Sequence, residues 1–217
     1  MPHEHILYIP FVLLTGFITG VLFARRKRDP FETTRPAPSS RKNGVLLIVT
    51  FLAVVIVFAG THLVAIPGGM KAVSIAAGNA ELFDQHPSFT ASEVQSRVEA
   101  LGPQGRMQYR IMTFTSDVIF PATMLAFLIM LGRTIASGRH QSVFKTALLA
   151  LPIAWFLTDM IENMAIFLVI SAFPARSMLA GTLGYLTVVK FSLFLTAFGA
   201  AAMAVLGLSN RAKSDTA

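Results

Sequence analysis

The chain has 217 residues, of which 54% are hydrophobic and 13% are charged. An average soluble domain is roughly 25% charged, so this composition indicates a protein that lies in a membrane. The net charge is +7, but the basic residues lie where apolar blocks end and not across one face, which argues against a nucleic-acid partner. No cysteine is present, which excludes disulfides, thiolate metal sites and cysteine nucleophiles.

Five apolar blocks predict an all-α fold, an integral membrane bundle of five helices. Each block is long enough, at about 1.5 Å of rise per residue, to cross the roughly 30 Å hydrocarbon core. The blocks are residues 6–24, 45–66, 111–131, 144–171 and 181–208. They divide the chain into an N-terminal transmembrane helix (1–24), a basic linker (25–44) and a four-helix membrane domain (45–217).

The distribution of basic residues predicts the orientation of the bundle. Lysine and arginine gather in the linker, in the loop after the third block and in the C-terminal tail. By the positive-inside rule these segments, with the C-terminus, are cytoplasmic, so the N-terminus and the outer loop of residues 67–109 lie outside. Basic residues follow the first block instead of preceding it, so we expect an uncleaved anchor. The protein is expected to be a multi-pass protein of the cell membrane, the inner membrane of a bacterium.

The outer loop contains a predicted short amphipathic helix. Thr90 is its expected N-cap, and Glu93 completes a capping box three residues later. The apolar stripe of this helix consists of Val94, Val98 and Leu101. Glu93 and Arg97 form an expected i,i+4 ion pair on the other face. Two interpretations stay open for the helix, a connector packed on the bundle or a lid over a cavity.

Gly16 and Gly20 stand in G-x-x-x-G spacing within the first block. This spacing allows two helices to approach closely in lipid. The contact is either internal to the bundle or made with a partner, a second copy of the chain or another membrane protein. The lipid bilayer is the remaining expected partner.

Four ionisable residues stand inside the apolar blocks, with an asparagine beside them: Asp117, Asp159, Glu162, Lys190 and Asn163. A charge at the bilayer centre costs about 2.5–3.5 kcal/mol on insertion scales, so such residues normally face a protein interior and pair with one another. Counted along their helices, they lie at similar depth in the outer half of the bilayer. We therefore expect them to meet in one buried polar cluster.

Helical spacing supports this cluster. Asp159, Glu162 and Asn163 fall at i, i+3 and i+4, on one face of the fourth span. In the third span one continuous helix is expected to carry a polar stripe from the outer surface inward. That stripe consists of Arg106, Arg110, Thr113 and Asp117.

Charge counting turns the cluster into a functional hypothesis. The three carboxyl groups face Lys190, and Arg110 is expected to reach down as a second positive group. One carboxyl group is then left over, and it either binds a cation or stays protonated. The alternative is a closed hydrogen-bonded network that only fixes the register of the helices.

Other polar and special residues contribute less to the hypothesis. His62 lies near the outer end of the second span and is a weaker candidate for the same site, because a lone histidine there is usually an interface residue. No second histidine lies inside another span, which argues against a bis-histidine haem, and the cofactor is unknown. Trp155 is interpreted as packing or as an interface anchor. Three prolines are expected to kink or end helices and to free backbone carbonyls near the polar centre: Pro121, Pro152 and Pro174.

Three short runs carry a resemblance. Gly105–Tyr109, Asp117–Pro121 and Asp159–Asn163 give the patterns GRxxY, DxxFP and DxxEN. With these patterns the chain resembles uncharacterised bacterial multi-pass membrane proteins. The resemblance covers about residues 89–167. It implies that the polar stripe works as a unit, and it implies no activity.

Three functions follow from these observations. The first is a polar pocket, open to the outside, that binds a cation, a proton or a small amphiphile, as a sensor or carrier. The second is a structural or accessory membrane subunit whose polar cluster only holds the helices together. The third is an intramembrane enzyme on a lipid-like substrate, with a carboxyl group of raised pKa as general acid and Lys190 as electrophile. The chain has no HExxH, GxSxG, P-loop or dinucleotide motif, so an ATP-driven or hydride-transfer role needs another subunit.

Overall fold

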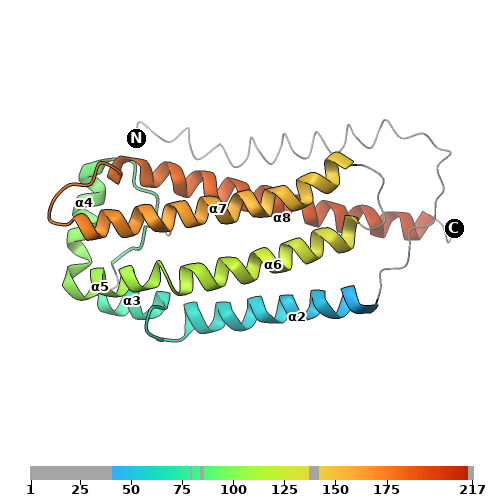
Figure 1. Ribbon diagram of the computed structural model, residues 1–217, viewed down its shortest axis with the longest axis horizontal. Helices are drawn as coiled ribbons and strands as arrows, with labels where there is room; N and C mark the ends of the chain where they lie inside the picture. The colour runs from blue at the N-terminus through green and yellow to red at the C-terminus, as the bar shows by residue number, and fades with distance from the viewer. Residues whose placement is uncertain (1–40, 79, 84–85, 137–141, 215–217) are drawn as a thin grey trace.

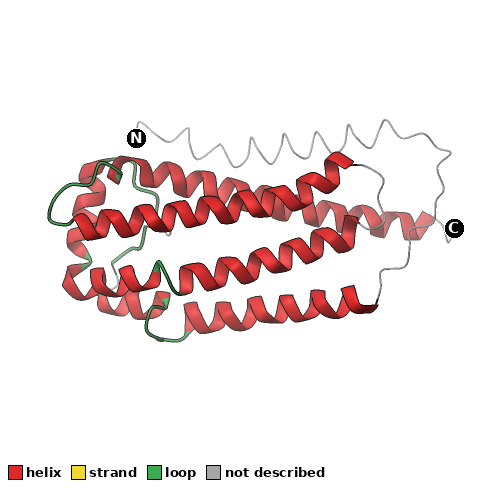
Figure 2. Ribbon diagram, viewed as in Figure 1, coloured by secondary structure: helices red, strands yellow, loops and turns green. Residues whose placement is uncertain are grey.

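The computed structural model describes residues 41–78, 80–83, 86–136 and 142–214. Four long helices lie side by side along the molecule, and three short helices gather at one end, which we call the cap (Figure 1). Loops join the helices, so the described chain is all-α as predicted (Figure 2). The long helices are α2 (Arg41–Phe58), α6 (Ser116–Ala136), α7 (Ser142–Ala172) and α8 (Leu183–Ser214). The π-helical turn η2 (Ala59–Leu63) continues α2, and the 3-10 turn η3 (Ala180–Thr182) precedes α8. The cap helices are α3 (Met70–Ala76), α4 (Ala91–Ala100) and α5 (Gly102–Met112).

Four segments of the described chain are long and apolar enough to cross a membrane. They are Asn43–Leu63, Gly102–Ala136, Lys145–Ala172 and Ala180–Ala202. These segments match the predicted second to fifth spans, so four long apolar helices indicate a multi-pass membrane protein. The predicted first span, with Gly16 and Gly20, and residues 25–40 of the predicted linker lie outside the described residues. Since α2 begins at Arg41, the last residues of the predicted linker are helical.

The third span differs from the prediction, because its helix is interrupted. α5 ends at Met112, residues 113–115 form a turn, and α6 begins at Ser116. The prediction of one continuous helical stripe from Arg106 to Asp117 was therefore wrong. α6 alone has 21 residues, about 31 Å, which is enough to cross the hydrocarbon core. Asp117 lies at the cap end of that helix.

A glycine carbonyl holds this interruption in place. The Ser116 hydroxyl donates to the carbonyl oxygen of Gly68 at 2.6 Å, and the Thr115 hydroxyl is shared between the carbonyl oxygens of Ile111 at 2.8 Å and Gly68 at 3.1 Å. Gly68 has φ +72°, a left-handed conformation that costs other residues energy, and a Cβ there would lie 2.4 Å from the Thr115 hydroxyl oxygen. The loop between η2 and α3 therefore fixes where α5 ends and α6 begins.

α4 confirms the predicted short amphipathic helix between the second and third spans. The Thr90 hydroxyl oxygen accepts a hydrogen bond from the Glu93 amide at 3.2 Å, as a capping box requires. The Glu93 carboxylate accepts from the amide of Phe89, one residue before the cap, at 3.3 Å. The residues of the predicted apolar stripe are buried: Val94, Val98 and Leu101.

Arg97 has a different role from the predicted ion pair with Glu93. Its guanidinium donates to the carbonyl oxygens of Leu82 at 2.7 Å and Glu81 at 3.2 Å, and to the Ser88 hydroxyl. It also lies 4.8 Å from the centre of the Phe83 ring. These contacts tie the loop before α4 to the helix, because one side chain satisfies several backbone carbonyls at once.

The cap packs against the bundle through an apolar core. Tyr109 of α5 is fully buried, and its hydroxyl accepts from the amide of Phe83 at 3.0 Å. Side chains from α7 and α8 complete this core: Ile166, Val169, Ile170 and Leu183. Burial on this scale favours the packed connector over the lid for α4.

Gly184 provides a test of this docking. Its amide donates to the Ser88 carbonyl at 2.8 Å, and a Cβ there would lie 2.5 Å from the same oxygen. We expect Gly184→Ala to destabilise the protein by roughly 1–3 kcal/mol and to lower its melting temperature in detergent by several °C. The matched control is Gly181→Ala, because nothing lies within 4 Å of a Cβ at Gly181. Equal melting temperatures for the two variants would contradict the close approach of α8 to this loop.

Candidate functional site

α7 and α8 supply the charged centre of the bundle. Asp159, Glu162 and Asn163 lie on one face of α7 and are 6%, 0% and 5% exposed, and Lys190 of α8 is 7% exposed. The Lys190 ammonium lies 3.3 Å from an Asp159 carboxylate oxygen and also forms an ion pair with Glu162. The predicted meeting of charges from these two spans is therefore present. One cation between two acids satisfies the need of each buried charge for a partner.

Glu162 lies in the sealed part of this centre. One of its carboxylate oxygens is in the ion pair with Lys190, and the other accepts a hydrogen bond from the Thr187 hydroxyl. Thr187 is 1% exposed and stands three residues before Lys190, so both partners come from one face of α8. Thr187 was not among the predicted site residues. Its i−3 spacing from Lys190 was the available signal.

Asn163 of α7 bonds to the backbone carbonyl of Asp117 at the start of α6, which has no donor within its own helix. Pro121 has no N–H, so it makes no i→i−4 hydrogen bond to the carbonyl of Asp117. The Asn163 amide donates to that carbonyl oxygen at 2.9 Å and to the Asp159 carboxylate at 3.3 Å. The expectation that Pro121 frees a carbonyl near the polar centre is confirmed, and Asn163 is the group that satisfies it.

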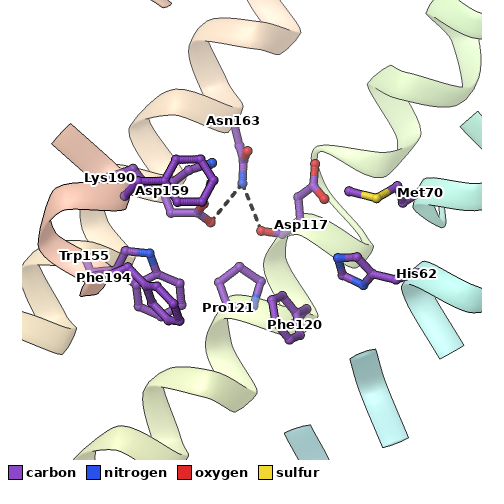
Figure 3. Close-up of a pocket in the computed structure, with 11 residues that line it drawn as sticks. His62, Met70, Asp117, Phe120, Pro121, Trp155, Asp159, Asn163, Lys190 and Phe194 are labelled. Carbon is purple, nitrogen blue, oxygen red and sulfur yellow. Dashed lines mark hydrogen bonds and ion pairs between the residues drawn. The ribbon is translucent and has the colours of Figure 1, made fainter. Parts of the chain in front are cut away.

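A cavity of about 280 Å³ opens among these residues. Figure 3 shows Asn163 between Asp159 and Asp117, with His62 and Met70 on the opposite side from Lys190. The polar lining residues are His62, Asp117, Asp159, Asn163 and Lys190. The apolar lining residues are Met70, Phe120, Pro121, Trp155, Phe191 and Phe194. The cavity therefore has a charged part and an aromatic part.

The aromatic part lies one helical turn from the charged part on each helix. Trp155 precedes Asp159 by four residues, and Phe194 follows Lys190 by four, so each pair shares a helix face. The Trp155 and Phe194 rings are in contact, with centroids 5.2 Å apart. Trp155 was interpreted from the sequence as packing or an interface anchor. The spacing of four residues between Trp155 and Asp159, and between Lys190 and Phe194, was the sequence feature that could have predicted an aromatic wall beside the charges.

Two predicted site residues lie away from the cavity. Arg106 donates to the carbonyl of Val98 at 3.1 Å and lies 4.2 Å from the centre of the Phe173 ring, and Arg110 is exposed. Neither belongs to the cavity lining, so the expectation that Arg110 reaches down as a second positive group was wrong. The helix break at residues 113–115 is the reason, because it separates the arginines from α6.

The charge balance of the cluster changes accordingly. With all groups ionised, the three acids carry −3 and Lys190 carries +1, so the cluster has a formal charge of −2: Asp117, Asp159 and Glu162 against Lys190. The predicted surplus of one carboxyl group thus becomes two. Asp159 and Glu162 are buried and Asp117 is half-buried, and excess negative charge in such surroundings is costly, so the site favours the uptake of positive charge.

Comparison with protein-family models, curated proteins and solved structures gave no significant match to this chain. The resemblance of the GRxxY, DxxFP and DxxEN runs to bacterial membrane proteins stays a prediction. The function is therefore argued from the geometry of the site.

The link between Asn163 and Pro121 can be tested by a double-mutant cycle. Asn163→Leu leaves the buried Asp117 carbonyl without its donor, which we expect to cost roughly 1–3 kcal/mol. In a Pro121→Ala background the new amide at residue 121 can donate to that carbonyl. Asn163→Leu should then cost about 1 kcal/mol less, as measured by detergent unfolding of the four proteins. Strictly additive losses would mean that the carbonyl does not depend on Asn163.

Proposed function

We propose that the cavity binds a small organic cation with an apolar body, and that the protein serves as a membrane sensor or carrier of this ligand. The observation that carries the proposal is the pairing of surplus negative charge with an aromatic wall in one cavity. Asp117 and Asp159 line it with Lys190, and Glu162, which is outside the lining, pairs with the same lysine, so a ligand ammonium would bring the charge toward neutrality. Low dielectric surroundings strengthen that attraction.

The aromatic lining favours an organic cation over an inorganic one. Ring faces attract cations, and the attraction is strongest for tryptophan and for ligands whose charge is poorly hydrated, such as quaternary ammonium groups. Trp155 is 5% exposed and its ring adjoins Phe194, so these rings offer a desolvated wall to the apolar body of the ligand. The charged end and the apolar end of one ligand would then each have a matching surface.

The size of the cavity limits the ligand. About 280 Å³ equals about nine molecules of liquid water at roughly 30 Å³ each, and it lies just below the range of roughly 300–1,000 Å³ found for drug-sized ligands. A small ammonium compound fits this volume, whereas a whole phospholipid does not. The ligand class is therefore a single amine or quaternary ammonium group attached to a short apolar body.

The sealed half of the cluster supports a structural role within the same protein. Glu162 is fully buried, is bonded to Thr187 and Lys190, and does not line the cavity. We infer that Glu162 holds α7 against α8, while Asp117 and Asp159 act on the ligand. If the protein is instead a structural or accessory subunit, the entire cluster holds helices together as Glu162 does, and none of its residues binds a ligand.

Ligand binding is tested with benzyltrimethylammonium and its uncharged carbon isostere, neopentylbenzene. We expect the cation to bind the purified protein at least about tenfold more tightly than the isostere, measured by calorimetry in detergent, because the cavity charge acts only on the cation. Asp117→Asn should remove most of this preference, because it neutralises one of the two acids that line the cavity. Equal affinity for the two compounds, or no binding of either, would reject the proposal.

The structural role of Glu162 is tested by Glu162→Gln. Removing one partner of a buried ion pair costs roughly 3–5 kcal/mol, so this variant should melt well below the wild type. The matched control is Glu81→Gln, because Glu81 is exposed in the cap and the same substitution there should have almost no effect. A Glu162→Gln protein as stable as the control would show that the Lys190 pair does not hold α7 against α8.

A further inference from the structure

His62 occupies a place in the cavity that the proposed cation site does not use. It belongs to η2, a single π-helical turn at the end of α2, a feature that is frequent at functional sites. Its ring stacks on Phe58 with centroids 4.4 Å apart and meets the Phe120 ring edge-on at 5.0 Å. The imidazole is thus held by two aromatic rings at the cavity wall, across from Lys190 (Figure 3).

The hydrogen bonds around Thr61 determine which nitrogen of His62 takes up a proton. The Thr61 hydroxyl donates its single proton to the Val57 carbonyl at 2.7 Å, so it can only accept from His62 Nδ1, which lies 2.8 Å away. Nδ1 therefore carries the hydrogen of the neutral ring. Nε2 is the nitrogen that gains a proton when the ring becomes charged.

We propose that His62 Nε2 is a proton site that competes with the organic cation, so that binding of the cation releases a proton. The inference rests on the proposed function, because it needs a cation in the same cavity. A sphere of about 280 Å³ is about 8 Å across, so the ligand charge and a charged imidazole lie within roughly that distance. At an effective dielectric constant of about 20, two like charges about 8 Å apart weaken each other's binding by about 30-fold.

The other charged groups around His62 are compatible with this exchange. Asp117 of α6 faces the same cavity and attracts either positive charge, and Asp159 of α7 and Lys190 of α8 lie in the wall beyond it. α2 and η2 contain no other titratable residue between Asn43 and Leu63. α3 presents Met70 to the cavity and carries Lys71 on its exposed side. The acids attract the charged imidazole and the organic cation alike. The repulsion between these two positive charges is therefore the reason that binding of one disfavours the other.

The experiment measures benzyltrimethylammonium affinity at a series of pH values from about 5 to about 8, the range in which histidine is the side chain that ordinarily changes its charge. The probe has a permanent charge, so any pH dependence belongs to the protein. We expect wild-type affinity to fall as the pH is lowered through this range, by up to the coupling of about 30-fold. His62→Gln should change less than threefold. The matched control, His86→Gln, replaces an exposed histidine of the cap and should behave as wild type.

A second measurement needs only the wild-type protein and stays informative if His62→Gln fails to fold. A pH indicator in weak buffer should record proton release on binding of the cation, in the pH range where wild-type affinity changes. Binding without proton release anywhere in that range, or an unchanged pH dependence in a folded His62→Gln protein, would overturn the proton site and leave the cation site intact. No binding at any pH would overturn both.

Discussion

The structure depends on the Lys190 ammonium, which lies between the carboxylates of Glu162 and Asp159 inside a bundle of apolar helices. Each of these charges alone would cost several kcal/mol in hydrocarbon, so the ion pairs require α7 and α8 to pack against each other. Glu162 satisfies this need completely in a sealed position, with Thr187 as its second partner. Asp159 pairs with the same lysine but also lines the cavity. The contact that holds α7 and α8 together is therefore adjacent to the proposed binding surface.

A second constraint aligns α6 with this pair. Pro121 leaves the Asp117 carbonyl without a helical donor, and Asn163 supplies one from α7, one residue after Glu162. This bond holds the backbone of Asp117 beside the cavity that this residue lines, while the turn at residues 113–115 and the Gly68 carbonyl fix the start of its helix. In the cavity lining, charged side chains lie one helical turn from bulky rings, and His62 lies on the side opposite Lys190.

The sequence allowed much of this arrangement to be predicted. Apolar blocks predicted the four described spans, the Thr90 capping box predicted α4, and the i, i+3, i+4 spacing placed Asp159, Glu162 and Asn163 on one face. It did not predict the turn before α6, because that turn depends on hydroxyl contacts with Gly68, 47 and 48 residues earlier in the chain. Arg110 was misplaced for this reason. The cavity wall was missed because Trp155 and Phe194 look like ordinary apolar residues until the register between α7 and α8 is known.

The central claim is that the charged cluster and the aromatic wall form one site for one cation. It is tested most directly by a crystal structure with 4-bromobenzyltrimethylammonium, in which anomalous scattering locates the bromine. The account predicts bromine beside Trp155 and Phe194, with the ammonium group toward Asp117 and Asp159. Bromine found only on the lipid-facing surface, or an ammonium group directed away from both aspartates, would contradict it.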